Sequence, residues 1–210
     1  MESIKGNLFI ITAASGAGKT SLVKALVNDK PNIKVSISFT TRNPRVGEVD
    51  GKDYFFLDEV NFEKMVENNE FLEMAKCHGS LYGTSKLTVK EALDKGEDII
   101  LEIDYQGAFK VKKLFPDSIS IFIIPPSIRA LEDRLHNRGQ DSEKDIKLRV
   151  AAARNEMSHL DKFDYVTIND NFEKALFELK KIVNFNPEAL KLKTENQILN
   201  HKYLIDELKK

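Results

Sequence analysis

Residues 8–20 read Leu8-Phe9-Ile10-Ile11-Thr12-Ala13-Ala14-Ser15-Gly16-Ala17-Gly18-Lys19-Thr20, and the main architecture can be predicted from them. The apolar first part has the length of a buried strand, the glycines indicate a turn, and apolar residues recur at helical spacing after Thr20. In such a unit the backbone N–H groups of the turn converge on an anion, and the helix N-terminus adds partial positive charge. The segment therefore predicts a phosphate-binding loop for ATP or GTP.

The segment matches the pattern GxxxxGK[ST] except at its first position, where Ala13 replaces glycine. Alanine suits this position unless the backbone there needs a positive φ. Lys19 would supply a positive charge for the β- and γ-phosphates, and the Thr20 hydroxyl is placed to hold Mg²⁺. The alternative is an ordinary strand, turn and helix with a surface lysine. The predicted ATP-binding residues of the loop are Ala13, Ala14, Ser15, Gly16, Ala17, Gly18, Lys19 and Thr20.

The composition predicts one compact catalytic unit. The 210 residues are 41% hydrophobic, which is enough for one good core. Lys and Arg total 32 against 33 for Asp and Glu, so we expect no nucleic-acid partner. The single cysteine, Cys77, excludes an internal disulfide and a cysteine-rich metal site. No apolar run approaches membrane-spanning length, and we expect a cytoplasmic protein with no membrane partner. A homo-oligomer is left open.

The order of the predicted elements indicates an α/β fold. From residue 98 onward strands and helices alternate regularly, which predicts a parallel sheet with helices on both faces. Residues 33–38 alternate like a strand, and a long helix is expected to run through Leu160. Short strands and one or two helices over 36–90 suggest a small inserted lobe. The polar, glycine-containing stretch between His136 and Asp145 joins two helices and is a candidate lid.

Seven motifs occur in one order along the chain: Ser15-Gly16-Ala17-Gly18-Lys19, Thr40-Thr41-Arg42-Asn43-Pro44-Arg45-Val46-Gly47-Glu48, Gly51-Lys52-Asp53-Tyr54-Phe55-Phe56, Phe71-Leu72-Glu73, Tyr82-Gly83-Thr84, Asp104-Tyr105-Gln106-Gly107 and Asn137-Arg138-Gly139. By these motifs the sequence resembles the guanylate kinase family from about Ile4 to Val183. Several independent motifs in the family's order distinguish this family from other proteins with a phosphate loop far better than the phosphate loop alone does.

The resemblance implies a P-loop NTPase-type parallel sheet flanked by helices, with an inserted small α+β GMP-binding lobe and a helical lid. Residues 1–210 would form a single unit, divided into a nucleotide-binding core (4–35, 91–125 and 160–185), a GMP-binding lobe (36–90), a lid (126–159) and a C-terminal helical tail (186–210). The implied reaction is Mg²⁺-dependent transfer of the γ-phosphoryl group of ATP to GMP, giving ADP and GDP in purine nucleotide metabolism. The nucleotides ATP and GMP are the expected partners, and dGMP is a further expected acceptor.

The acceptor phosphate is expected to bind to the polar loop that carries Arg42 and Arg45. Two guanidinium groups three residues apart could clamp a phosphate bidentately, although two lone arginines more often belong to a solvated basic loop. The resemblance also implies that Tyr54 and Tyr82 donate hydrogen bonds to this phosphate. A tyrosine beside Phe55 could equally fill the core.

Recognition of the base is expected to depend on Glu73. Guanine presents two adjacent donors, N1–H and the N2 amino group, and one carboxylate can accept both, whereas adenine offers no such pair. The alternative is an ordinary acid on the solvent face of a strand. The resemblance places the hydroxyls of Ser38 and Thr84 toward the guanine and Asp104 near the base and the metal. Glu102 stands where the family often has aspartate, so any contact it makes with metal or Lys19 stays open.

The transfer step asks the protein to align two nucleotides and to neutralise developing charge. The expected catalytic residues are Lys19, Arg42, Arg138 and Arg149. The resemblance places Arg134 with the lid arginines on the ATP side and Asn169 near the adenine. Arg134 and Arg138 are four residues apart and could instead be solvated helix surface. Asn169 could be an ordinary turn residue after a strand.

Two other functions are weighed against this enzyme. A guanylate-kinase-like scaffold module would keep the fold and bind peptides, but such modules tend to lose the catalytic residues that stand in place here. A related kinase could phosphorylate a different acceptor. The set formed by Glu73, Ser38 and Thr84 favours guanine, because an acceptor without a base would not need it.

Overall fold

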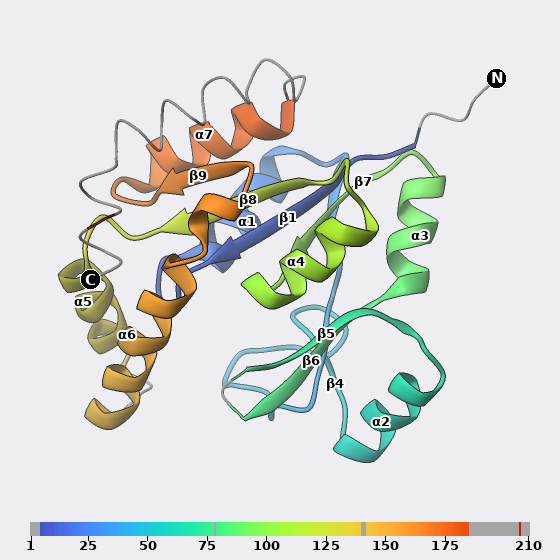
Figure 1. Cartoon of the computed structure of the whole chain (residues 1–210), viewed down its shortest axis with the longest axis horizontal. Coiled ribbons are helices and arrows are strands. Elements are labelled where there is room, and N and C mark those ends of the chain that lie inside the picture. The colour runs from blue at the N-terminus through green and yellow to red at the C-terminus, as the bar shows by residue number, and fades with distance from the viewer. Residues whose placement is uncertain (1–4, 78, 140–141, 185–205, 207–210) are drawn as a thin grey trace. The chain divides into compact units, whose positions relative to one another are not determined.

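The computed structural model describes residues 5–77, 79–139, 142–184 and 206 (Figure 1). Five parallel strands form one sheet in the order β2-β7-β1-β8-β9, and helices flank it, which confirms the expected α/β class. The strands are β1 (Leu8–Ala13), β2 (Ile33–Val35), β7 (Asp98–Glu102), β8 (Ile119–Ile124) and β9 (Tyr165–Ile168). Every residue of β8 and all but the last of β1 are buried, as a strand covered on both faces requires.

By its internal contacts the chain divides into two compact units, Met1–Ile10 with Pro31–Ser118 and Ile11–Lys30 with Ile119–Lys210. The finer partition expected from the sequence, with a lobe at 36–90 and a lid at 126–159, stays a prediction. The expected tail at 186–210 lies outside the described residues apart from Asp206.

The first unit contains a second, smaller sheet of four strands in the order β4-β3-β6-β5. The strands of this sheet are β3 (Phe39–Thr40), β4 (Phe55–Phe56), β5 (Phe71–Cys77) and β6 (Ser80–Ser85). The helices of the first unit are α2 (Glu59–Glu67), α3 (Lys86–Asp94) and α4 (Tyr105–Leu114). Aromatic rings hold α2 to this sheet, since the rings of Phe62 and Phe71 stack with centroids 4.5 Å apart. A β-bulge between Phe71 and Glu73 shifts the register so that Glu73 pairs with Thr84. This register matters for the site.

The helices begin where the sequence supplies a capping side chain. Asp58 accepts a hydrogen bond from the Asn61 N–H at 2.7 Å at the start of α2, and Asp104 accepts one from the Gly107 N–H at 2.7 Å at the start of α4. Ser142 forms a capping box with Asp145. These caps satisfy N–H groups that the first turn of a helix cannot bond internally.

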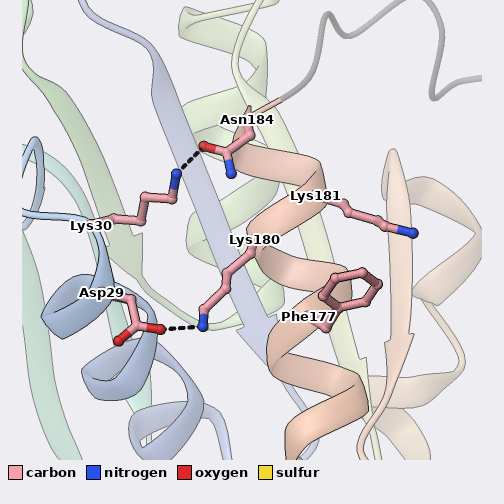
Figure 2. Close-up of a pocket in the computed structure, with 6 residues that line it drawn as sticks. All are labelled: Asp29, Lys30, Phe177, Lys180, Lys181 and Asn184. Atoms are coloured by element: carbon pink, nitrogen blue, oxygen red, sulfur yellow. Dashed lines mark hydrogen bonds and ion pairs between the residues drawn. The ribbon is translucent and has the colours of Figure 1, made fainter.

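The second unit contains α1 (Lys19–Asp29), α5 (Ile128–Arg138), α6 (Glu143–Met157), a 3₁₀ helix (Leu160–Lys162) and α7 (Phe172–Asn184). Helices α1 and α7 pack together and line a pocket of about 440 Å³ that is largely open to solvent (Figure 2). Lys30 donates to the Asn184 side chain at 2.6 Å, Lys180 pairs with Asp29, and Lys181 lies over the Phe177 ring. None of the predicted site residues lines this pocket, so it is not the candidate site.

Two expected boundaries are wrong. Strand β2 ends at Val35 instead of Ser38, because the following residues carry the chain from the five-stranded sheet to the four-stranded one. The long helix α6 ends at Met157, and Leu160 begins a 3₁₀ helix. Ser158 follows α6 with its hydroxyl donating to the Asn155 carbonyl at 2.7 Å, a local bond that competes with helix continuation. Within the described residues, no helix is both long and apolar enough to span a membrane.

Candidate nucleotide-binding site

The predicted phosphate loop leaves β1 and enters α1 as a tight turn. The Ala14 N–H donates to the Ile123 carbonyl of β8 at 3.2 Å, and the Ala17 N–H donates to the Ala14 carbonyl at 2.9 Å. Gly16 and Gly18 have φ values of 87° and 93°, a region that only glycine adopts without strain. Ala13, in contrast, ends β1 in extended conformation. The first position of the motif therefore needs no glycine here, and alanine fits it.

Asn169 and Arg134, both predicted to lie on the ATP side, hold the outer part of this loop. The Asn169 side chain donates to the Ala17 carbonyl at 2.7 Å, and Arg134 donates to the Asn169 carbonyl at 2.7 Å. A β-carbon on Gly18 would lie 2.5 Å from the Asn169 amide nitrogen, so the close approach also requires glycine. Asn169 directly follows β9, as expected of a residue after a strand, and it is buried with its side chain bound to the loop.

Helix α6 reaches the same loop through two side chains that are seven residues apart on one face. Arg149 donates from Nε to the Ser15 hydroxyl at 3.1 Å, and Glu156 accepts from the Ser15 N–H at 2.9 Å. The structure thus brings Arg149 to the loop. Glu156 was not predicted from the sequence, because its spacing from Arg149 places both residues on one helix face but does not show which loop that face meets. Arg138 is the last residue of α5, while Lys19 and Thr20 are the first two residues of α1.

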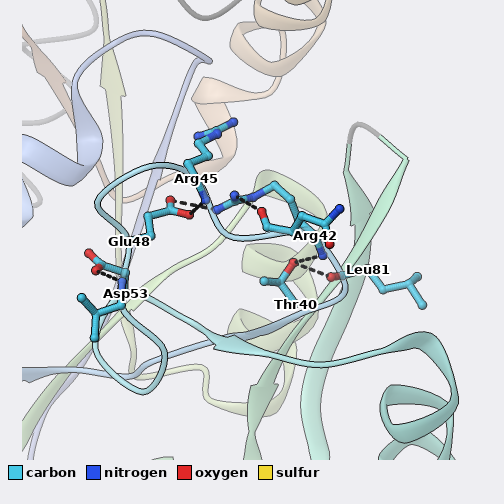
Figure 3. A network of polar contacts seen from close by, with 8 residues as sticks. Thr40, Arg42, Arg45, Glu48, Asp53 and Leu81 are labelled. Carbon is cyan, nitrogen blue, oxygen red and sulfur yellow. Dashed lines mark hydrogen bonds and ion pairs between the residues drawn. The ribbon is translucent and has the colours of Figure 1, made fainter.

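The loop that carries Arg42 and Arg45 is organised by Glu48 (Figure 3). One Glu48 oxygen accepts from the Arg42 guanidinium at 2.9 Å, and the other accepts from the Arg45 N–H at 2.7 Å. The Arg42 guanidinium also lies over the Tyr54 ring, 5.3 Å from its centroid. The Tyr82 and Tyr54 rings meet edge to face with centroids 6.0 Å apart. Arg42, Tyr54 and Tyr82 therefore form one cluster, with Arg45 exposed beside it.

The titratable side chains of this cluster and of Glu48 have pKa values shifted from their ordinary ones. Desolvation lowers the pKa of Arg42, but its interactions with Glu48 and Tyr82 outweigh this effect and raise the pKa overall. For Glu48 desolvation raises the pKa, and the hydrogen bonds from Arg42 and Arg45 outweigh it, so the pKa is lowered below 4.5. Burial raises the pKa of Tyr54 to about 12, so its phenol stays protonated and can donate a hydrogen bond at neutral pH.

We predict that Glu48→Gln raises the KM for the expected acceptor, GMP, by roughly threefold to tenfold, because Arg42 loses its charged partner and the loop loses one anchor. The lowered pKa means that the Glu48 carboxylate stabilises the fold above pH 4.5 and loses this effect as the pH falls through its folded-state pKa. The difference in Tm between wild type and variant should therefore shrink below pH 4.5. Glu91→Gln is the control, since its pair with Lys95 is exposed and 3.9 Å long. An unchanged KM in both variants would contradict the role of Glu48.

Glu73 is buried, with 5% of its surface exposed, and lies opposite Thr84 across the β5–β6 pair. The Thr84 hydroxyl donates to Glu73 Oε1 at 2.7 Å. An acid that only followed surface alternation would be solvated, so that alternative is wrong. A buried carboxylate is costly unless hydrogen bonds satisfy it, and this cost points to a functional reason for keeping it.

Asp104 lies at the start of α4 and is engaged through both oxygens. Oδ1 caps the helix through the Gly107 N–H, and Oδ2 accepts from the Cys77 thiol at 3.4 Å. Ser38 precedes β3, and its carbonyl accepts from the Phe55 N–H at 2.9 Å. Among the described residues, no three His, Cys, Asp or Glu side chains gather in a metal-binding cluster.

Comparison with known proteins identifies the family. The family model described as guanylate kinase matches residues 5–186. Guanylate kinase from Methylobacillus flagellatus is 53% identical over 205 residues, which are 98% of this chain and 100% of that protein. The enzyme from Psychrobacter arcticus is 55% identical over 186 residues, 89% of each chain. The crystal structure of guanylate kinase from Anaplasma phagocytophilum has a TM-score of 0.71 at 30% identity, covering 97% of this chain and 98% of that one.

Matches of this identity extend over nearly the whole chain, and they agree with the phosphate loop and with the order of motifs along the sequence. The chain therefore belongs to the guanylate kinase family.

Proposed function

We propose that this chain is an ATP:GMP phosphotransferase that uses Mg²⁺ and the residues described above to convert ATP and GMP to ADP and GDP. The observation that carries the assignment to guanine is the buried Glu73 carboxylate, held by Thr84. The same compact unit contains the Arg42 loop with its tyrosines. A site that binds a nucleoside monophosphate needs two parts, an acid that recognises the base and a loop that binds the phosphate.

On the donor side, residues 13–20 bind the phosphates of ATP through backbone N–H groups, and Lys19 neutralises the charge of the β- and γ-phosphates. Arg149 acts on the γ-phosphate together with Arg138. The contact between Arg149 and Ser15 supports this role, because it already holds one guanidinium at the loop. Asn169 and Arg134 border the adenine side, where their hydrogen bonds to the loop keep its shape.

On the acceptor side, Arg42 and Arg45 clamp the phosphate of GMP, and Tyr54 and Tyr82 donate to it. The hydroxyls of Ser38 and Thr84 and the carboxylate of Asp104 complete the surroundings of the base. The acceptor phosphate attacks in ionised form, so the reaction needs no general base. Alignment and charge neutralisation supply the catalysis. The same contacts suit dGMP, since none of the proposed groups is assigned to the 2′-hydroxyl.

Thr20 is the residue best suited to hold Mg²⁺, because its exposed side-chain hydroxyl stands in the first turn of α1. Asp104 suits the ion less well, since both of its carboxylate oxygens already accept hydrogen bonds. Kinases bind Mg²⁺ mainly through nucleotide phosphates and water with few protein ligands, so Thr20 alone is a sufficient protein contribution. The ion would supply charge stabilisation for the transferred phosphoryl group.

The test is ADP formation from ATP and Mg²⁺ with GMP, AMP, CMP or UMP as separate acceptors. We expect turnover with GMP at a rate far above that with the other three. Folded protein that binds GMP but releases no ADP with any acceptor would contradict the enzyme and favour a scaffold module. Equal turnover with GMP and AMP would contradict the role of Glu73 in base choice.

A further inference from the structure

Glycine at position 107 permits an unusually close contact between helix α4 and the Glu73 carboxylate. Helix α4 packs against β5, the strand that carries Glu73. A β-carbon built on Gly107 would lie 2.5 Å from Glu73 Oε2 and 3.0 Å from its Cδ. Real β-carbons do not approach other atoms to 2.5 Å. The present position of Oε2 is therefore compatible with glycine at 107 and with no other residue.

The backbone conformation at position 107 does not require glycine, although a β-carbon there would also lie 3.3 Å from Asp104 Oδ1. Gly107 lies in the first turn of α4 and has no positive φ. In a helix, glycine is less favourable than alanine, so an alanine here would stabilise α4 if only the helix mattered. The glycine is thus retained at a cost to the helix, at the point where the helix meets the acid.

The two neighbours of the Glu73 carboxylate complement each other. Thr84 holds Oε1 by a hydrogen bond at 2.7 Å, and Gly107 lets Oε2 settle against the first turn of α4. The partial positive charge at a helix N-terminus favours an anion in this place. Asp104 caps the same turn through the Gly107 N–H and keeps it in position. The carboxylate is thereby held in one orientation.

We propose that Gly107 is a positioning residue for base selection. Because it has no β-carbon, Glu73 Oε2 can lie against helix α4, in the orientation in which the carboxylate accepts the two donors of guanine. This inference depends on the proposed role of Glu73 in binding GMP. It does not require Gly107 to touch the nucleotide.

The test is Gly107→Ala, measured by steady-state kinetics and thermal unfolding. The alanine methyl would displace the Glu73 carboxylate by somewhat less than about 1 Å. A misplacement of this size in a substrate-binding group lowers catalytic efficiency by roughly tenfold to a hundredfold. We expect the KM for GMP to rise by that factor while the KM for ATP stays unchanged and the Tm is equal or higher. The preference for GMP over IMP, which lacks the N2 amino group, should fall, because this preference reports how the carboxylate is oriented.

Two further variants separate positioning from a general structural role. Glu73→Asp shortens the acid by one methylene and makes room for a methyl at 107, so Gly107→Ala should cost little GMP affinity in the Glu73→Asp background. Gln106→Ala changes an exposed side chain in the same helical turn and should leave all constants unchanged.

Glu73→Gln, measured in parallel, distinguishes failure of this inference from failure of the proposed function. A strong effect of Glu73→Gln with an unchanged GMP KM in Gly107→Ala would overturn the role of Gly107 alone. A Gly107→Ala protein with raised KM values for both nucleotides and a lower Tm would also overturn it. No effect of either variant would overturn the role of Glu73 itself.

Discussion

Replacing Lys19 with alanine is expected to lower kcat by about a thousandfold, because the ammonium group neutralises charge that develops on the transferred phosphoryl group. The turn of the loop should survive, since it depends on the positive φ of Gly16 and Gly18 and on the bond from Asn169 to Ala17. GMP affinity should be unchanged, because the proposed GMP-binding residues belong to other segments of the chain. The measurements are kcat with both substrates saturating and GMP binding by calorimetry.

Lys24→Ala provides the matched control for this variant. Lys24 is exposed on the same helix, five residues further along, and belongs to no proposed site. A Lys19→Ala protein that keeps more than about a tenth of the wild-type kcat would contradict the assignment, since one well-placed charge in a phosphoryl-transfer site contributes far more than tenfold.

Glu73→Gln is expected to lower kcat/KM for GMP by about a hundredfold or more. The amide keeps the size of the side chain but offers one acceptor and one donor where guanine presents two donors. A site built around specific hydrogen bonds discriminates strongly because a mismatch leaves buried polar groups unpaired. The KM for ATP should not change. The ratio of kcat/KM for GMP to kcat/KM for AMP should fall, because adenine offers a neighbouring donor and acceptor that an amide can match.

The control for this variant is Glu63→Gln on α2, which makes the same chemical change at an exposed position. Equal losses for GMP and ATP in the Glu73→Gln protein would show that the residue acts on folding rather than on base recognition. Its buried position makes the comparison of Tm values an essential part of the measurement.

The order of elements could be predicted because local signals agree with the fold. The mostly apolar sequences of β1 and β8 are typical of strands buried on both faces, and Asp58 and Ser142 stand at the helix starts that they cap. The wrong predictions concern the ends of elements, namely those of β2 and α6. The end of β2 depends on the passage between two sheets, which no local pattern encodes.

The candidate site could be predicted in outline but not in its supporting contacts. Arg42, Glu73 and Lys19 stand in motifs that express their chemistry directly. Glu48 and Gly107 also stand in motifs, but their support of Arg42 and of Glu73 follows only from contacts in the structure, and Glu156 belongs to none of the motifs. Glu156 reaches Ser15 across 141 positions of sequence, and Gly107 matters only because α4 packs on β5. Such contacts arise from tertiary packing, so the type of residue alone does not reveal them.

The central claim, transfer of the γ-phosphoryl group from ATP to GMP, is tested most directly by following the label of γ-labelled ATP. We predict that with GMP present the label appears in the β-phosphate of GDP, in amounts equal to the ADP formed, and that omission of GMP stops ADP release. Label that appears as inorganic phosphate at the same rate with and without GMP would contradict the claim, because the protein would then hydrolyse ATP without using the acceptor.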